Sequence, residues 1–282
     1  MPKLIGYGQD AVRTALICQH DNRSSREILP AWLGSFSELT AIVVIEEPRS
    51  LVLRRLRMEA RRSRFRLLDV LAFRLYYRVR FARRDAREIA ARDEALVARY
   101  GPPPAGVPVL RVSDVNAPAV REFLAAARPD ITLARCKTLL SPEIFEVPAR
   151  GTVVAHPGVC PEYRNAHGCF WALARRDLDR VGATLLTIDA GVDTGPVLGH
   201  YSADFDEVRD THVVIQHAVV FENLDRIAAD LRAHAAGTLE PVDTQGRESR
   251  VWGQPRLTDW VRWKRAARRR GRATASTSRW VA

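Results

Sequence analysis

Long hydrophobic runs are absent from this chain of 282 residues. No uninterrupted apolar segment approaches the ~20 residues of a membrane-spanning helix, so we expect no such helix. The start, MPKLIGYGQDAVR, lacks a basic stretch followed by an apolar one, and we therefore expect no secretory signal and a cytoplasmic location. The four cysteines form no Cys-x-x-Cys pair, which argues against a disulfide or zinc scaffold.

Motifs for other cofactors are also absent. The sequence contains no Walker motif, EF-hand loop or zinc-ligand spacing. The glycines of IGYGQD do not follow a predicted strand, so they form no dinucleotide fingerprint. Two aspartates in a glycine loop with one nearby histidine are explained more simply by proton transfer than by a metal site, and we expect no metal.

Acidic residues are scarce in two segments, which together account for the net charge of +11. Residues 49–92 hold fifteen arginines against four acids, and residues 260–282 hold eight lysines and arginines and no acid. The rest of the chain is therefore acidic, at about −8. A nucleic-acid function would have to depend on those two segments alone.

The first 160 residues alternate short β-branched runs with helical patterns. This alternation predicts an α/β fold with a doubly wound, mostly parallel sheet. The predicted strands are residues 15–18, 41–45, 107–112, 130–134 and 152–155, and the predicted helices are 24–35, 119–127 and 142–147. Further along, a helix over 168–178, a strand pair at 183–188 and 197–201, and a helix over 212–236 complete the pattern. We expect residues 1–237 to form the α/β domain and 238–282 a short extension ending in a disordered basic tail.

Residues 49–92 interrupt the alternation. Leucines recur there at roughly helical spacing among the arginines, which predicts an inserted basic helical pair. In one interpretation its arginines are solvated or pair with the acidic body. In the other they form a surface that contacts anionic lipid, nucleic acid or an acidic partner. The pattern leaves both interpretations open.

A histidine at the end of a predicted strand and an acidic loop form the most informative pair in the chain. The strand Thr152–Ala155 continues directly into His156-Pro-Gly, and Asp193 lies in the later loop IDAGVDTGPV. An imidazole can take a proton near neutral pH, and a neighbouring carboxylate orients it and stabilises its charged form. The pair therefore indicates a proton-transfer site at the carboxyl edge of an open α/β sheet.

The motifs HPG, PEYRN and DAGVDTGPV, in this order, resemble the formyltransferase family. The family pattern is Asn-x-His-Pro-Ser/Gly, a Pro-x-Tyr-Arg turn and an Asp-Thr-Gly loop, and the resemblance extends more faintly from about Ala15 to Gly237. It implies a Rossmann-type fold shared by glycinamide ribonucleotide, methionyl-tRNA and sugar N-formyltransferases. It also implies an enzyme that moves a formyl group from 10-formyltetrahydrofolate to an amine.

Site roles follow from the same resemblance. His156 would be the base and Asp193 its partner and proton relay, with His167, Tyr163 and Arg164 on the acceptor side. The pterin would lie between two loops and be held largely by backbone groups. The residues of these loops are Arg135, Cys136, Lys137, Thr138, Leu139 and Leu140 in the first, and Asp189, Ala190, Gly191, Val192 and Asp193 in the second.

Three features depart from the family pattern, and one of them is the pocket loop, which carries Arg135 and Lys137 where the family commonly has small and apolar residues. Val154 stands where the family has the asparagine whose amide donates to the tetrahedral oxyanion, and such a donor is worth about 3–4 kcal/mol. Asn165 stands where glycine usually follows Tyr-Arg. It either supplies a substitute amide donor, which would make it a catalytic residue, or only satisfies a turn.

The acceptor is expected to be a small-molecule amine. Methionyl-tRNA formyltransferases add a C-terminal β-barrel, and the 45 residues after Gly237 are too few for one, which disfavours tRNA. The segment VWGQPRLTDWVRW is expected to pack on the body instead. Hydrolysis of formyltetrahydrofolate, and an altered or inactive binding or regulatory protein on the same fold, remain as alternatives to transfer.

Overall fold

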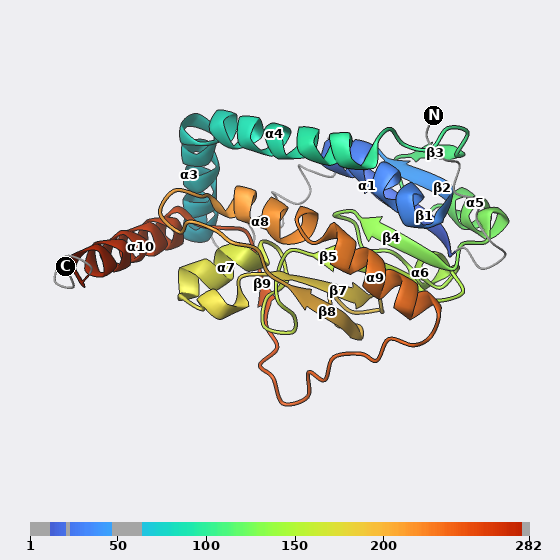
Figure 1. Ribbon diagram of the computed structural model, residues 1–282. Coiled ribbons are helices and arrows are strands. Elements are labelled where there is room, and N and C mark those ends of the chain that lie inside the picture. The colour runs from blue at the N-terminus through green and yellow to red at the C-terminus, as the bar shows by residue number, and fades with distance from the viewer. Residues whose placement is uncertain (1–11, 21–22, 47–63, 278–282) are drawn as a thin grey trace.

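The computed structural model describes residues 12–20, 23–46 and 64–277. A seven-stranded sheet forms its centre (Figure 1). The strands are β1 (Arg13–Gln19), β2 (Glu38–Ile45), β3 (Val109–Val112), β4 (Ile131–Arg135), β5 (Thr152–His156), β7 (Ala183–Thr187) and β8 (Val197–Tyr201). Their order is β3-β2-β1-β4-β5-β7-β8, with parallel pairing from β3 to β5 and antiparallel pairing of β7 with both its neighbours. The predicted doubly wound, mostly parallel sheet is confirmed.

Helices cover the sheet on both faces. One layer consists of α1 (Arg23–Phe36), α8 (His212–Phe221) and α9 (Leu224–Ala235), and the other of α5 (Pro118–Ala127) and α6 (Pro142–Phe145). Side chains alternate between the faces along each strand, so that Leu16 and Cys18 enter the first core and Ala15 and Ile17 the second. Both α5 and α6 begin with proline, whose fixed φ suits a first helical turn.

The basic insert is helical where the structure describes it. Helices α3 (Arg64–Arg80) and α4 (Ala82–Tyr100) are consecutive, and α4 lies along α1 (Figure 1). Residues 49–63 of the predicted pair fall outside the described residues. The pair therefore continues eight residues beyond its predicted end at residue 92.

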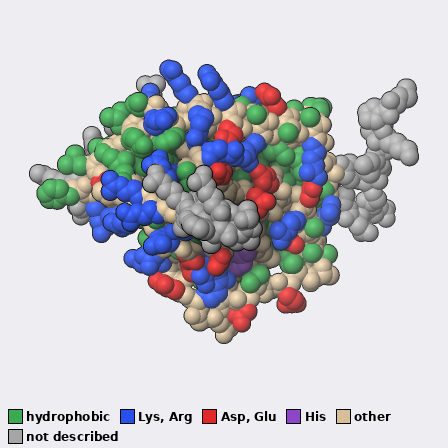
Figure 2. Space-filling model, turned by 60° about the vertical axis from the view of Figure 1, so that its left-hand side comes forward, with side chains coloured by type: hydrophobic (Ala, Val, Ile, Leu, Met, Phe, Trp, Pro, Cys, Tyr) green, Lys and Arg blue, Asp and Glu red, His purple; other side chains and the backbone are tan. Residues whose placement is uncertain are grey.

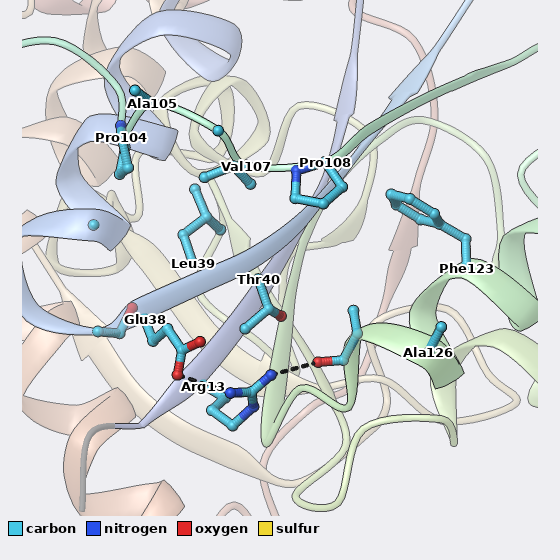
Figure 3. A pocket seen from close by; sticks show the side chains of 14 residues that line it. Arg13, Glu38, Leu39, Thr40, Pro104, Ala105, Val107, Pro108, Phe123 and Ala126 are labelled. Atoms are coloured by element: carbon cyan, nitrogen blue, oxygen red, sulfur yellow. Dashed lines mark hydrogen bonds and ion pairs between the residues drawn. The ribbon is translucent and has the colours of Figure 1, made fainter. Parts of the chain in front are cut away.

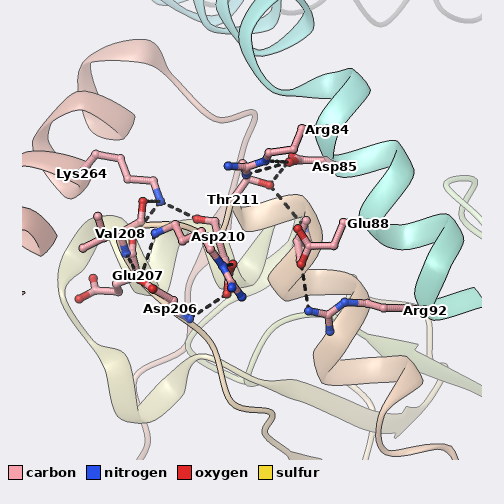
Figure 4. Close-up of polar contacts among 12 residues, drawn as sticks. Arg84, Asp85, Glu88, Arg92, Asp206, Glu207, Val208, Asp210, Thr211 and Lys264 are labelled. Carbon is pink, nitrogen blue, oxygen red and sulfur yellow. Dashed lines mark hydrogen bonds and ion pairs between the residues drawn. The ribbon is translucent and has the colours of Figure 1, made fainter.

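Two buried aspartates fasten α4 to the body. Asp85 accepts hydrogen bonds from Thr211 at 2.5 Å and from Tyr77 at 2.9 Å, and Asp93 accepts from Ser24 at 2.6 Å. Figure 4 shows Asp85 and Thr211 facing one another between α4 and the start of α8. Because a buried carboxylate is costly unless it is hydrogen-bonded, these contacts fix where α4 can lie. The described part of the insert is thus part of the packed fold.

The C-terminal segment packs on the body as expected, although its details differ. Strand β9 (Val251–Trp252) pairs with the short strand β6 (Arg164–Asn165), and helix α10 (Leu257–Thr277) follows. Trp260 and Trp263 of α10 are fully buried, and Lys264 donates to backbone carbonyls of residues 207, 208 and 210 (Figure 4). The expected disorder of the tail is wrong as far as Thr277, because alanine and arginine are strong helix formers and the start of α10 is anchored.

The predicted helix over 212–236 is two helices. It ends at Phe221 and restarts at Leu224, with Asn223 between them. The Asn223 side-chain amide donates to the carbonyl oxygens of Ser202 and Val219, at 2.8 and 3.1 Å. A side chain that competes with the backbone in this way favours a break, which apolar spacing alone does not reveal.

Among the described residues, no helix combines the length and apolar character that a membrane crossing requires.

Candidate active site

Helix α7 (Gly168–Arg175) and the 3₁₀ turn η1 (Leu178–Arg180) follow β6 and lie beside the end of β5. The carboxyl ends of β1, β4 and β5 meet at this edge, where an open α/β sheet usually places its site. A cavity of about 610 Å³ lies at the opposite, amino-terminal edge, among Arg13, Glu38 and Phe123 (Figure 3). It contains no histidine, so we place the candidate site at the carboxyl edge, where the proton-transfer groups are.

His156 ends β5 and is almost completely buried. Its Nε2 lies 2.9 Å from the carbonyl oxygen of Tyr163, and its Nδ1 lies 3.6 Å from Oδ2 of Asp193. A carbonyl oxygen can only accept, so Nε2 carries the proton in the neutral ring. This leaves the lone pair of Nδ1 on the side of Asp193, too far away for a direct hydrogen bond.

The glycine of the HPG motif makes this orientation of His156 possible. A Cβ atom on Gly158 would lie 2.5 Å from the Tyr163 carbonyl oxygen and 2.6 Å from Nε2 of His156. Any other residue here would separate the imidazole from its hydrogen-bond acceptor. Thr184 of β7 holds the same turn, because its hydroxyl donates to the Gly158 carbonyl and accepts from the Cys160 amide.

Asp193 reaches His156 on a loop that folds back along the sheet. Since β7 runs antiparallel to β5, the loop begins beside Thr152, at the far end of β5, where the Ile188 amide donates to the Thr152 carbonyl. The backbone amide of Asn165 donates to Oδ2 of Asp193 at 2.7 Å. Asp193 has a positive φ of 50°, which a short polar side chain tolerates. Backbone geometry therefore aims this carboxylate at His156.

Asp189 shapes the same loop from within. Its Oδ1 accepts from the Gly191 amide at 2.9 Å and from the Thr194 hydroxyl at 2.6 Å. A Cβ atom on Gly191 would lie 1.9 Å from that hydroxyl, so the turn requires glycine. Arg164 fastens the loop to β6 by donating to the Val192 carbonyl at 3.0 Å. Of the predicted loop residues, Asp189 and Val192 thus hold the backbone that carries Asp193.

The side chain of Asn165 is occupied elsewhere. Its amide nitrogen donates to the carbonyl oxygen of Trp252 at 2.6 Å, across the β6–β9 ladder. Its φ of 75° is a turn conformation that asparagine adopts readily. The structure therefore brings Asn165 to the site through its backbone amide, with its side chain bonded to β9.

Val154 lies two residues before His156 on β5 and so faces the same side of the sheet. It is partly exposed and packs against a small cluster of Cys160, Leu186 and Val197. Val154 occupies the position of the asparagine in the family pattern. Its side chain is thus directed toward the face of the sheet that the Asp193 loop covers.

The first predicted donor loop follows β4, the parallel neighbour of β5. Its Leu139 carbonyl accepts from the side-chain amide of Asn116 at 3.0 Å, and the Leu139 side chain is largely exposed. Arg135 points into the helical layer instead, where its guanidinium stacks over Phe221 and donates to the Ala155 carbonyl. Burial lowers the pKa of Arg135 to about 10, so it stays charged near neutral pH. Arg135 is therefore directed away from His156, and the exposed part of the loop lies further along.

Two further predicted acceptor-side residues, Tyr163 and His167, lie near the pair. Tyr163 is buried and donates to Asp177 at 2.8 Å, while its carbonyl holds His156. His167 precedes α7 with a positive φ of 57°. Burial lowers the pKa of His167 to about 4, so its ring is neutral near pH 7.

The contribution of β9 was not predicted. Trp252 stacks between Tyr163 and Trp171, with ring centroids 5.7 and 4.8 Å away, and its indole nitrogen donates to the Glu162 carbonyl. Gln254 follows, and its side-chain oxygen accepts a hydrogen bond from Arg74 of α3 at 3.2 Å. A two-residue strand carries no periodicity, so the tryptophans were the only signal for this contact.

The buried His167 predicts a specific dependence of stability on pH. Above pH 6.5 the ring is neutral in both the folded and the unfolded chain. Between pH 6.5 and about 4 only the unfolded chain takes up the proton, so stability falls as pH falls, by about 3 kcal/mol in total for this group. His167→Gln should therefore flatten the pH dependence of the unfolding free energy, measured with urea at pH 7 and 4.5. An unchanged slope in His167→Gln would contradict the neutral ring of His167 in the folded chain.

Comparisons with known proteins agree with the fold. A methionyl-tRNA formyltransferase from Myxococcus xanthus (strain DK1622) is 35% identical over 94 residues, covering 33% of this chain and 30% of that protein. Another, from Sorangium cellulosum (strain So ce56), is 29% identical over 170 residues, covering 58% and 52%. The chain thus spans about a third to a half of the length of these curated relatives.

Solved structures share the fold at low sequence identity. Glycinamide ribonucleotide transformylase 1 from Symbiobacterium toebii has a TM-score of 0.51 at 14% identity and covers 89% of this chain and 99% of its own. A sugar N-formyltransferase from Shewanella sp FDAARGOS_354 has a TM-score of 0.52 at 11% identity, covering 89% and 86%. The family model described as formyl transferase matches residues 85–228, just over half of the chain, and both His156 and Asp193 lie inside the match. The chain belongs to the formyl transferase family.

Proposed function

We propose that this protein transfers a formyl group from 10-formyltetrahydrofolate to the amine of a small molecule, with His156 as the base and Asp193 as its partner. The observation that carries the proposal is the approach of Asp193 Oδ2 to Nδ1 of His156, at 3.6 Å, at the carboxyl end of β5. Membership of the family supports the class of reaction.

The protonation of His156, with a proton on Nε2 and a lone pair on Nδ1, fits attack by an amine. An amine that attacks a formyl carbon must lose a proton, and Nδ1 of His156 is the nitrogen with a free lone pair. Once protonated, the ring is held between the Tyr163 carbonyl and the Asp193 carboxylate, and both stabilise the positive charge. The Asn165 amide keeps Asp193 in place during the step.

The loops present fit a pterin ring bound by backbone groups. Ala190 and Gly191 in the Asp193 loop are exposed, so a flat ligand can reach the backbone there. Val154 gives the covered face an apolar surface. Residues Lys137–Leu139 and Asp189–Val192 would hold the donor, which supplies the formyl carbon that is transferred.

Limited access to the pair supports a compact acceptor. The side chains of His156 and Asp193 are only 7% and 17% exposed, and Trp252 closes the side beside Asn165. A primary amine on a small molecule, such as an amino sugar, would reach these partly covered groups more easily than a bulky acceptor.

The proposal is tested by supplying the purified protein with 10-formyltetrahydrofolate and either amino sugars or aminoacylated initiator tRNA. We expect an N-formylated small amine and free tetrahydrofolate in equal amounts. Formylation of the charged tRNA without any small amine would refute the acceptor class. Release of tetrahydrofolate with free formate and no acceptor would show a hydrolase instead.

A further inference from the structure

Helix α3 carries a continuous stripe of exposed apolar side chains. Positions 65, 68, 72, 75 and 79 follow the spacing that aligns side chains on one face of a helix. The large members of the stripe are unusually exposed for apolar residues: Phe65 86%, Leu68 62%, Leu75 65% and Val79 79%. Its opposite face is buried, because Val70 and Phe73 pack into the body and Phe73 contacts Phe170 and Trp260. The stripe is therefore outward-facing on a helix whose inner face already has a partner.

Arginines border the stripe on both sides. By helical spacing Arg78 lies along one edge and Arg80 along the other. Both are exposed, and among the described residues neither lies within ion-pair distance of a carboxylate. The single acid of α3, Asp69, is turned toward α10, where it accepts from Thr258. The outward face of α3 thus combines apolar and cationic side chains without an acidic one.

Helix α10 extends the cationic surface beside α3. The two helices pack together, and Arg265, Arg268 and Arg269 of α10 are exposed. Figure 2, seen from the side on which α10 projects, shows lysine and arginine side chains gathered next to hydrophobic ones. Cationic groups that flank an apolar stripe match the boundary between anionic headgroups and acyl chains.

We propose that the outward face of α3 docks on the surface of a membrane that contains anionic lipids, with Phe65, Leu68, Leu75 and Val79 inserted and the arginines at the headgroups. A second copy of the chain fits this face less well, because an isologous contact would place Arg78 and Arg80 against arginines with no acid to pair. Nucleic acid would use the arginines and leave the aliphatic stripe in water.

The docking face is connected to the candidate site. Arg74 of α3 donates to Gln254 at 3.2 Å, and Gln254 lies just after β9, whose Trp252 stacks on Tyr163 beside the candidate site. An acceptor held at a membrane surface would therefore meet the protein on the side where the acceptor residues lie. The proposal goes beyond formyl transfer and stands without it, because lipid binding can be measured with no substrate present.

Sedimentation of the full chain with vesicles tests the proposal. We expect binding to phosphatidylglycerol–phosphatidylcholine vesicles and much weaker binding to phosphatidylcholine alone. Leu68→Gln/Leu75→Gln should lower the partition coefficient at least about tenfold by removing inserted surface. Arg78→Gln/Arg80→Gln should lower it about tenfold or more on anionic vesicles and have little effect on neutral ones.

Val97→Gln, which replaces an exposed valine on α4 away from the stripe, is the matched control and should bind as the wild type does. Thermal unfolding of each variant should be close to wild type because the replaced side chains are exposed. Equal sedimentation of wild type and both double variants would overturn the proposal. So would a stable dimer that Leu68→Gln/Leu75→Gln dissociates, or binding to single-stranded nucleic acid without any binding to vesicles.

Discussion

Replacing His156 by alanine is expected to lower kcat for formyl transfer by about 10²- to 10⁴-fold, the usual contribution of a positioned base. Another histidine near the site, His167, cannot replace His156, because burial lowers the pKa of His167 to about 4 and makes it a poor proton acceptor at pH 7. Binding of the formyl donor should change little, since the loops assigned to it do not depend on the imidazole. The kcat ratio measured at saturating amine checks this result.

Asp193→Asn separates the charge of the partner from its shape. An asparagine keeps an oxygen for the Asn165 amide but cannot stabilise a charged imidazole, so we expect kcat to fall about a hundredfold. Asp179→Asn removes an exposed carboxylate from η1 and serves as the control, with activity within about twofold of wild type.

If His156→Ala retained more than about a third of the wild-type kcat, the assignment of the base would be wrong.

Val154→Asn is expected to raise kcat by about tenfold. The side chain at 154 faces the same side of β5 as His156, so an amide there can donate to the oxyanion formed when the amine attacks. One such donor is worth about a hundred- to a thousandfold in other enzymes, and we expect less because the surroundings of Val154 are built for an apolar group.

The gain in activity should come with a loss in stability. A polar amide in the cluster of Cys160, Leu186 and Val197 costs about 1–2 kcal/mol of unfolding free energy. Val154→Leu provides an apolar control that should not raise kcat. If Val154→Asn folds and its kcat is unchanged or lower, another group of this chain already serves as the oxyanion donor.

Much of the α/β framework followed from the sequence because its strands are local apolar runs. The predicted strand 197–201 coincides with β8, and the strand before His156 coincides with β5 except for one residue. The pairing of His156 with Asp193 was predictable because both follow recognisable motifs. Here local pattern and tertiary arrangement agree.

The features that sequence reasoning missed depend on contacts between distant segments. Strand β9 is only two residues long and exists because β6 offers it backbone partners. The side chain of Asn165 is directed by the Trp252 carbonyl, 87 residues away, and no local rule specifies that. Asn223 breaks a helix through a bond to Ser202, which lies just after the end of β8. Such contacts become visible only once the chain is folded.

The most direct test of the central claim is the joint measurement of tetrahydrofolate release and N-formyl product in wild type and His156→Ala, with donor binding titrated in both. The account predicts that both proteins bind 10-formyltetrahydrofolate with similar affinity. Only the wild type should then form tetrahydrofolate and formylated amine in a one-to-one ratio at a measurable rate. Equal product formation by the two proteins, or donor binding with no turnover by the wild type, would contradict the claim that His156 and Asp193 carry out formyl transfer.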